Sequence, residues 1–450
     1  MAEVENGNAI SAGESFSMRI QRSLVQGSRD MNAYPILILD EIALYDRQIR
    51  LWGVQAQEKI RSANILLITV KALANEVAKN LVLAGIGSLT IIDHEPVSEA
   101  DLDASFFLEE ACKNEDVIKQ GKNRAEVAGP QIHRMNPRVK LHVDTADIRS
   151  KQPEFFSQFD VTIATELDFA SYTTINAACR IANRPFYAAG LHGFYGYVFA
   201  DLISHDFVIE REKSNAPTRQ QETLTRSVVS VTAKTEGEKS EKSGTKDKVI
   251  ELVTKREIYS PLQLANTSPL PEEYTNNVRR RKQVTPLLSC LRALWEFEKL
   301  SGGRRPSFAH QDLELFTRLA RESHQELKLD LATLDSAFLR QFLQNLGCEL
   351  SPVAAFVGGA LAQDVINVLS AREHPLQNML LFDGDKLAGP IYPLHPFFPP
   401  EMDVGSLAAV PPVANPIIMT PTTVTNLASH PAPHNAPVNS AVNMGVNPGL

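Results

Sequence analysis

Residues 65–93 read ILLITVKALANEVAKNLVLAGIGSLTIID, and this stretch decides the fold class. Its first four residues form a continuous apolar run, which is typical of a strand covered on both faces of a sheet. Apolar residues then recur at helical spacing from Leu73 to Leu81, and Gly85 is placed to end that helix. Leu89–Asp93 is a second apolar run that ends in an acidic residue. The stretch therefore predicts a strand–helix–strand unit of a parallel sheet.

The same alternation of strands and helices continues beyond this unit. Further strand or helix patterns cover residues 140–143, 161–165, 172–182, 186–189 and 195–202. Upstream, apolar residues from Ile49 to Ile60 recur at the spacing of an amphipathic helix. Near the other end, Ser351-Pro352 opens a long apolar helix, which residues 379–382 follow as a closing strand. The alternation predicts an α/β fold with a doubly wound, mainly parallel sheet.

Composition divides the chain into six segments. Residues 1–33 are polar and rich in Ser and Gly, which predicts a disordered arm. The α/β domain is expected in two parts, 34–212 and 346–400, and a helical subdomain is expected at 257–345. Between them, residues 213–256 are rich in Lys, Glu, Ser and Thr and are expected to form a charged, mobile insertion. Residues 401–450 lack Lys and Arg, which predicts a disordered, low-complexity tail.

The bulk composition argues against several classes of function. The net charge of −8 over 450 residues disfavours a nucleic-acid binder, which needs clustered Lys and Arg. No apolar run approaches membrane-spanning length, and the first 30 residues lack a secretory signal. The 4 cysteines are dispersed, which disfavours a zinc knuckle or a disulfide framework. His430 and His434 are separated by prolines that prevent a metal-binding helix, so no metal site is expected.

The loop after the first strand lacks the glycines that a nucleotide-binding loop uses. Such glycines permit a tight turn and let the backbone approach phosphate oxygens. Here Thr69, Ala72 and Ala74 occupy glycine-type positions, and each adds a Cβ where a phosphate would sit. Alanine still allows a helix to pack closely on a strand, so we expect the fold to survive without the binding surface. The unit by itself is also compatible with a fold that never bound a nucleotide.

Several blocks, in this order and spacing, resemble the ubiquitin-like-protein activating enzymes. The opening block is Tyr45-Asp46-Arg47-Gln48-Ile49-Arg50-Leu51-Trp52-Gly53, with Ala56-Gln57 shortly after it. The later blocks are Lys79–Ile86, Ile92-Asp93, Gly121-Lys122-Asn123-Arg124-Ala125, Asn136-Pro137, Leu350–Val353, Val357-Gly358-Gly359, Ala362-Gln363 and Phe382-Asp383-Gly384. The resemblance covers about residues 40–212 and 346–386. It implies a Rossmann-like adenylation fold of the ThiF/MoeB type.

Among the two-chain members of this family, the chain is most similar to the smaller, regulatory subunits of the SUMO type. The resemblance implies a heterodimer with a larger subunit, which binds ATP and Mg²⁺ and carries the thioester cysteine. SUMO and, through the complex, a conjugating enzyme would be further partners. Asp103-Ala104-Ser105-Phe106 departs from the family's ATP-binding pattern by lacking its arginine. No segment resembles the nucleophile motif, so Cys112, Cys179, Cys290 and Cys348 are expected to be structural.

The resemblance gives a catalytic role to Arg47, which would act in trans on the ATP site of the partner. A guanidinium is always charged and can grip two phosphate oxygens, so it suits a leaving pyrophosphate. Arg50 is the alternative for this role, and a solvated surface arginine is the simpler interpretation of either residue. Asp93 would hold a ribose in an active domain, but here a structural acid is expected.

Other readings of the sequence stay open. The equivalent subunit for another modifier, of the neddylation type, is the nearest alternative, although its insertion is larger than the break after Glu212. A self-sufficient adenylating enzyme or oxidoreductase would bind nucleotide alone, and a pure scaffold would leave Arg47 inert. The basic run Arg279-Arg280-Arg281-Lys282 and the family resemblance together predict residence in the nucleus, with a share in the cytoplasm.

Overall fold

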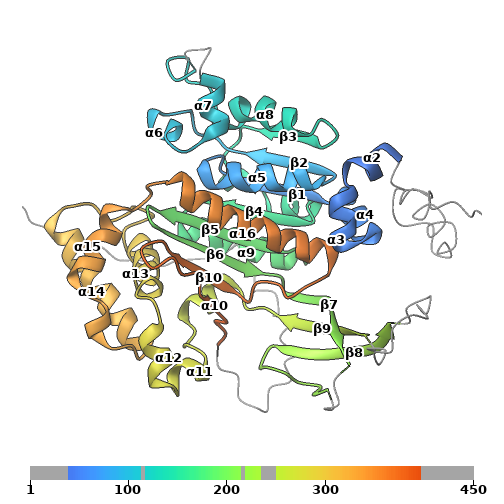
Figure 1. The fold of residues 1–450 in the computed structure, drawn as a ribbon. Coiled ribbons are helices and arrows are strands. Elements are labelled where there is room, and N and C mark those ends of the chain that lie inside the picture. The colour runs from blue at the N-terminus through green and yellow to red at the C-terminus, as the bar shows by residue number, and fades with distance from the viewer. Residues whose placement is uncertain (1–38, 113–116, 214–217, 235–249, 397–450) are drawn as a thin grey trace, which may run out of the picture. The chain divides into compact units, whose positions relative to one another are not determined.

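The computed structural model describes residues 39–112, 117–213, 218–234 and 250–396. An eight-stranded sheet with helices on both faces forms the centre of the described fold (Figure 1). Its strands, in spatial order, are β11 (Ile391–Tyr392), β10 (Met379–Asp383), β6 (Tyr195–Asp201), β5 (Phe186–His192), β4 (Val161–Thr165), β1 (Asn64–Ile68), β2 (Ser88–Ile92) and β3 (Lys140–Asp144).

The strand directions confirm the predicted fold class. Neighbouring strands from β5 through β4, β1 and β2 to β3 are parallel, whereas β6, β10 and β11 are added in antiparallel pairs. The order β3-β2-β1-β4-β5 is that of a doubly wound, dinucleotide-binding sheet. In such a sheet the ligand crevice lies at the carboxyl ends of the strands, where the strand order reverses, which here is between β1 and β4.

The apolar run of β1 is continuous because its side chains enter two cores. Ile65 and Leu67 belong to the core shared with α5 (Ala72–Ala84) and α16 (Ser351–Ser370), which lie side by side across one face of the sheet (Figure 1). Leu66 and Ile68 belong to the core of the other face, with α9 (Phe169–Ile181) and α13 (Leu287–Leu300). The remaining helices of the first part are α2 (Leu39–Leu44), α3 (Asp46–Trp52), α4 (Val54–Ser62), α6 (Glu99–Leu102), α7 (Phe106–Cys112) and α8 (Arg124–Met135), with 3₁₀ turns at Ile148–Ser150 and Pro153–Gln158.

The amphipathic helix expected before β1 is divided in two. Gly53 adopts a φ of +87° and separates α3 from α4, although Ile49 and Ile60 are both buried as their spacing predicts. A residue with a Cβ rarely adopts such a positive φ, whereas glycine, which has no Cβ, adopts it readily. The break gives α3 a direction of its own.

Residues 262–344 are helical and share a core with the sheet. Their elements are α10 (Leu262–Thr267), α11 (Glu272–Thr275), α12 (Val278–Gln283), α13, α14 (His310–Glu326), a 3₁₀ turn (Leu331–Thr333) and α15 (Ser336–Gln344). Trp295 of α13 stacks on Phe169 of α9 at 5.1 Å between ring centroids and meets Tyr197 of β6 edge-on at 5.6 Å. The helical segment is therefore one layer of the α/β fold.

Residues 213–256 are more regular than the sequence predicts. The described part contributes β8 (Arg226–Lys234) and most of β9 (Ile250–Ile258), which form a three-stranded antiparallel sheet with β7 (Ser204–Glu212). The expectation of a mobile insertion is wrong for these strands. Charged side chains are accommodated because a small sheet can keep one face in water, while Val253 and Phe207 are buried. Residues 214–217 and 235–249 lie outside the described residues, as do the expected arm at 1–33 and tail at 401–450.

Helix α16 corrects a second expectation. With 20 residues, it is long and apolar enough to span a membrane by length and composition, contrary to the sequence analysis. Its buried residues, however, pack against α5 and β6, and Asp364 in its middle accepts hydrogen bonds from the Tyr187 hydroxyl and the Leu376 amide, each at 2.7 Å. A core helix accounts for both the composition and the burial.

Candidate functional site

Helix α3 presents Arg47 to solvent. The opposite side of this helix is buried, with Tyr45 and Ile49 almost inaccessible. Arg47 itself is exposed and has no hydrogen bond or ion pair to any residue in the described part of the chain. An exposed, unpaired guanidinium keeps all of its donors available for an incoming anion.

Arg50 is placed differently on the same helix. Its Nη2 lies 2.9 Å from Asp46 Oδ2, an ion pair one helical turn away on the protein's own surface. Both arginines are exposed, but the charge of Arg50 is already matched by a carboxylate. The geometry therefore favours Arg47 over Arg50 as a donor to a foreign phosphate.

Two leucines flank Arg47 on the outer side of its helix. Leu44 is 54% exposed and Leu51 is 79% exposed. They stand three residues before and four residues after Arg47, which places all three on one side of a helix. The backbone supports this spacing, because the Tyr45 and Ile49 amides bond to carbonyls four residues back across the junction of α2 and α3. An arginine between exposed leucines is typical of a surface that meets a partner.

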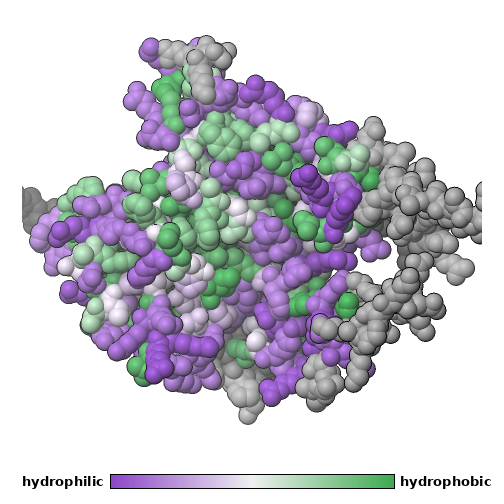
Figure 2. All heavy atoms as spheres, in the orientation of Figure 1, coloured by the Kyte–Doolittle hydropathy of each residue, from purple (hydrophilic) through white to green (hydrophobic). Residues whose placement is uncertain are grey.

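The sheet face crossed by α16 also exposes apolar side chains. Figure 2 shows them gathered among polar ones in the same orientation as Figure 1. Phe356 of α16 is about half exposed, although its ring stacks on Phe382 of β10 at 4.3 Å.

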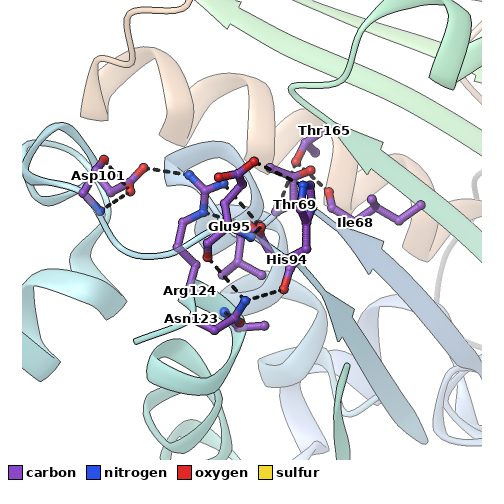
Figure 3. Close-up of polar contacts among 12 residues, drawn as sticks. Ile68, Thr69, His94, Glu95, Asp101, Asn123, Arg124 and Thr165 are labelled. Atoms are coloured by element: carbon purple, nitrogen blue, oxygen red, sulfur yellow. Dashed lines mark hydrogen bonds and ion pairs between the residues drawn. The ribbon is translucent and has the colours of Figure 1, made fainter. Parts of the chain in front are cut away.

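The predicted glycine-type positions lie at the start of α5. Thr69 adopts a φ of +68°, a left-handed conformation that a β-branched residue rarely takes. The Thr165 hydroxyl at the end of β4 donates to the carbonyls of Ile68 and Thr69 at 3.0 and 3.1 Å (Figure 3). Ala72 and Ala74 are fully buried against the sheet. The loop therefore has a left-handed backbone conformation, which favours glycine, at Thr69. The side chains of Thr69, Ala72 and Ala74 occupy the space that glycines would leave open.

The carboxylate of Asp93 is occupied by the protein's own donors. Arg124 Nε lies 2.9 Å from Asp93 Oδ2, and the Val70 amide donates to the same oxygen at 2.8 Å. The Glu95 amide donates to Asp93 Oδ1 at 2.9 Å. Both side chains of the ion pair are buried, and Asp93 therefore acts as a structural acid here.

Arg124 joins two acidic side chains at the first turn of α8. Besides Asp93 it meets Asp101 Oδ1 at 3.2 Å, as Figure 3 shows. Burial opposes its charge, but the two carboxylates outweigh that effect and raise its pKa above the ordinary value. Asn123 caps the same helix and also donates to the Asp93 carbonyl at 2.7 Å. Sequence reasoning quoted Asn123 and Arg124 only within a family block and missed this role, although a buried acid at a strand end requires a partner.

A carboxylate also stands at the N-terminus of α5, where a phosphate would bind in a nucleotide site. The backbone amide of Ala72 stabilises the charged form of Glu349. Burial and the neighbouring Glu166 nevertheless raise the pKa of Glu349 to about 7. A phosphate placed here would lie close to the carboxyl groups of Glu349 and Glu166, so these residues fit a nucleoside triphosphate poorly. The sequence contained no signal for Glu349, because it lies far along the chain from α5.

A small cleft lies at the carboxyl ends of β1, β2 and β4. Its volume is about 340 Å³. The lining includes the basic residues Lys71, Arg124 and Arg149 and the acidic residues Asp93, Glu95, Asp147 and Glu166. The cleft lies where the strand order reverses, so its position is that of a ligand crevice. Within its lining, Arg124 pairs with Asp93 and Arg149 pairs with Asp147.

The two sets of predicted site residues lie at opposite ends of α5. The Gln48 amide, next to Arg47, donates to the Leu83 carbonyl in the last turn of α5, whereas the cleft lies at the first turn. A helix of 13 residues rises about 20 Å. An arginine side chain is much shorter than this, so Arg47 cannot reach the cleft of its own chain.

The cysteines occupy four unrelated environments. Cys179 and Cys290 are completely buried, and burial raises the pKa of Cys179 to about 12 and that of Cys290 further. Burial also raises the pKa of the half-buried Cys112. Cys348 is exposed in the loop before α16. Within the described ranges, His, Cys, Asp and Glu form no group of three that could hold a metal ion.

Comparison with known proteins identifies the family of this chain. The chain is 39% identical over 357 residues to DNA damage tolerance protein RHC31 of Saccharomyces cerevisiae, covering 78% of this chain and 96% of that protein. It is 33% identical over 368 residues to DNA damage tolerance protein rad31 of Schizosaccharomyces pombe, covering 82% and 100%. It is 32% identical over 359 residues to SUMO-activating enzyme subunit 1 of Homo sapiens, covering 79% and 96%. The sequence pattern of the ThiF family matches residues 45–397, and this protein therefore belongs to the ThiF family.

Proposed function

We propose that this chain is the regulatory subunit of a SUMO-activating enzyme, which pairs with a larger, cysteine-bearing subunit and completes its ATP site. Relatives named SUMO-activating enzyme subunit 1 are 31–32% identical to the chain, which covers 93–96% of their length. The observation that carries the proposal is the position of Arg47. It is exposed, unpaired among the described residues, and separated from its own cleft by the length of α5.

Arg47 would act during adenylation of the modifier. In that reaction the carboxyl terminus of SUMO attacks the α-phosphorus of ATP, and pyrophosphate leaves. Arg47 would hold two phosphate oxygens in a fork and stabilise the negative charge that builds on the leaving group. Because the guanidinium comes from the second subunit, the full rate would require the assembled heterodimer. Arginines supplied in this way contribute about 10³–10⁵ in rate to other phosphoryl-transfer reactions.

ATP and Mg²⁺ would be held by the larger subunit, and this chain alone would bind neither. Two observations support this: Arg124 is paired with Asp93 in the cleft, and Glu349 stands at the start of α5. The thioester would form on the partner, because no segment of this chain resembles the family's nucleophile motif. Cys179 and Cys290 are also buried and have raised pKa values that disfavour the reactive thiolate. A conjugating enzyme would then be reached through the complex.

We also propose that the chain resides in the nucleus, with a share in the cytoplasm. The basic run forms α12, where Arg279, Arg280 and Lys282 are exposed and accessible to an import receptor. Replacing these three residues with alanine in a fluorescently tagged chain would abolish nuclear accumulation. An unchanged distribution would show that the run is only a solvated helix.

The function is tested by modifier-dependent ATP–pyrophosphate exchange. The chain alone, the heterodimer with a SUMO-type large subunit, and heterodimers carrying Arg47→Ala or Arg50→Ala would be compared. We expect no exchange by the chain alone and a loss of at least about 10²-fold in the Arg47→Ala pair. Arg50→Ala is the matched control on the same helix, and its effect should stay within about twofold because exposed ion pairs contribute little.

Each arm excludes one alternative. Exchange by the chain alone would mean that its own cleft binds ATP, and the proposal would be wrong. A fully active Arg47→Ala pair that still assembles would leave a scaffold as the function. Equal exchange with a neddylation-type modifier and its large subunit would identify the other branch of the family.

A further inference from the structure

Three side-chain amides, from three different elements, hold the last carbonyls of α5. Asn136 Nδ2, just after α8, donates to the Val82 carbonyl at 2.9 Å. Gln48 Nε2 of α3 donates to Leu83 at 3.2 Å, and Gln57 Nε2 of α4 donates to Ala84 at 2.9 Å. The final carbonyls of a helix have no partner within it, so the amides of Gln48 and Gln57 satisfy groups that would otherwise need water. The Val82 carbonyl also accepts a hydrogen bond from the Gly85 amide at 3.1 Å. Two of the three amides come from the segment that carries Arg47.

Tyr45 adds a second, more buried contact at the same place. Its ring lies over Gly85, where any Cβ would approach the ring to 2.5 Å and where φ is +82°. Its hydroxyl accepts a hydrogen bond from Asn136 Nδ2 at 2.8 Å. Tyr45 is 5% exposed, and it stands two residues before Arg47. Asn136 therefore bridges the end of α5 and the start of the arginine helix.

The far end of α3 is tied to the same region. Trp52 Nε1 donates to Gln57 Oε1 at 2.9 Å, while the amide of Gln57 holds Ala84. Helix α3 is thus fixed before and after Arg47, with Arg47 itself left in solvent. Ile42, Tyr45 and Ile49, with Val54 packed against them, form a small apolar cluster separate from the two main cores, and Trp52 at the end of α3 packs against the core of α5 and α16. Because the apolar cluster at the start of α3 is small, the direction of the helix there also depends on these polar contacts.

We propose that Tyr45 is a positioning residue, which sets the direction of Arg47 through its contacts with Gly85 and Asn136. The proposal rests on the role given to Arg47 above. An arginine that meets the phosphates of another subunit must leave its helix along one line, because a displacement of about 1 Å can cost about 10²-fold in rate. The Tyr45 hydroxyl is the most buried polar link between α3 and the rigid α5–α8 pair, so its loss should loosen α3 without unfolding the sheet.

The test is a double-mutant cycle in the heterodimer, measured by pyrophosphate exchange. Tyr45→Phe keeps the ring on Gly85 and removes only the hydroxyl. We expect it to lower kcat about tenfold, with the KM for ATP and the affinity between subunits unchanged. In an Arg47→Ala background the same change should have no further effect, because positioning acts only through Arg47.

Tyr195→Phe is the matched control. Tyr195 is buried on β6, and its hydroxyl makes one side-chain hydrogen bond, to Asp385 Oδ2 at 2.8 Å. The Tyr195→Phe substitution should leave kcat unchanged. Hydrogen exchange on the full chain gives a readout that is independent of activity, because Tyr45→Phe should speed exchange of the amides in 46–52 and spare those of α9.

The outcomes separate this proposal from the function on which it rests. If Arg47→Ala abolishes pyrophosphate exchange while Tyr45→Phe is fully active, the positioning role of Tyr45 is wrong and the proposed function stands. If Tyr45→Phe lowers kcat by the same factor with and without Arg47, the hydroxyl acts by another route and the proposal is also wrong. If the Arg47→Ala pair retains the full rate, the function and the positioning role fail together.

Discussion

Arg124 Nε lies 2.9 Å from Asp93 Oδ2, and both side chains are buried at the carboxyl end of β2. This ion pair stands where a nucleotide-binding fold opens its crevice. The same guanidinium reaches Asp101, so one cation pairs with two acids of the protein itself. The crevice of the fold is therefore present, but these polar side chains at its edge bind one another and not a ligand.

Removing that cation should destabilise the protein strongly. Arg124→Ala leaves Asp93 and Asp101 buried without a counter-charge, and breaking a buried pair in this way costs about 3–5 kcal/mol. Arg149→Ala is the control, since Arg149 is 56% exposed in its pair with Asp168 and should cost about 1 kcal/mol or less. Urea unfolding of both variants measures the difference. Equal losses would show that Arg124 has no special structural role.

Leu51 should contact the larger subunit. It is 79% exposed on the side of α3 that carries Arg47, so Leu51→Asp would place a charge in the interface and weaken pairing at least tenfold, about 1.4 kcal/mol. Ile181 at the end of α9 is 82% exposed, and Ile181→Asp should leave pairing unchanged. Calorimetric titration with the larger subunit gives both affinities. Unchanged affinity of the Leu51 variant would place the contact elsewhere.

Thr69→Gly should stabilise the chain even though most substitutions by glycine do the opposite. At a φ of +68° the threonine is strained, and relief of that strain should exceed the extra chain entropy by about 0.5–1 kcal/mol. Thr174→Gly, on the exposed side of α9, should instead destabilise by about 0.5 kcal/mol. Thermal unfolding at one protein concentration compares the two. A loss of stability in both variants would mean that Thr69 is not strained.

Asp364 should make stability depend on pH. Burial raises its pKa from 3.8 to about 6, and the hydrogen bonds from Tyr187 and Leu376 only partly offset this. The folded state therefore prefers the protonated acid, so this group's contribution is present below about pH 4 and is lost as pH rises to about 6. Asp364→Asn lacks the titration, and its stability relative to the parent should rise by about 2–3 kcal/mol across that window. Urea unfolding from pH 4 to 7 would reveal a flat difference if the prediction is wrong.

Local pattern was sufficient for the fold class. The apolar run of β1 predicts a strand buried on two faces, and the structure divides it between two cores. Proline near the start of α16 and glycine after α5 mark helix ends as expected. The sequence analysis missed strands β8 and β9 because a charged segment has few apolar residues to mark a strand. These strands form by pairing, β9 with β7 and β8 with β9. Such pairing joins residues far apart in sequence and leaves no local pattern.

The sequence by itself determined the strand–helix–strand unit, the loop without glycines and the arginine helix, because each depends on residues that are close along the chain. Only the tertiary structure decided that Arg124 holds Asp93, that Glu349 stands at the start of α5, and that Asn136 meets Tyr45. It also decided that Arg47 and the cleft lie at opposite ends of α5. These relationships depend on packing between distant segments, where burial forces each polar group to find a partner that no local pattern specifies.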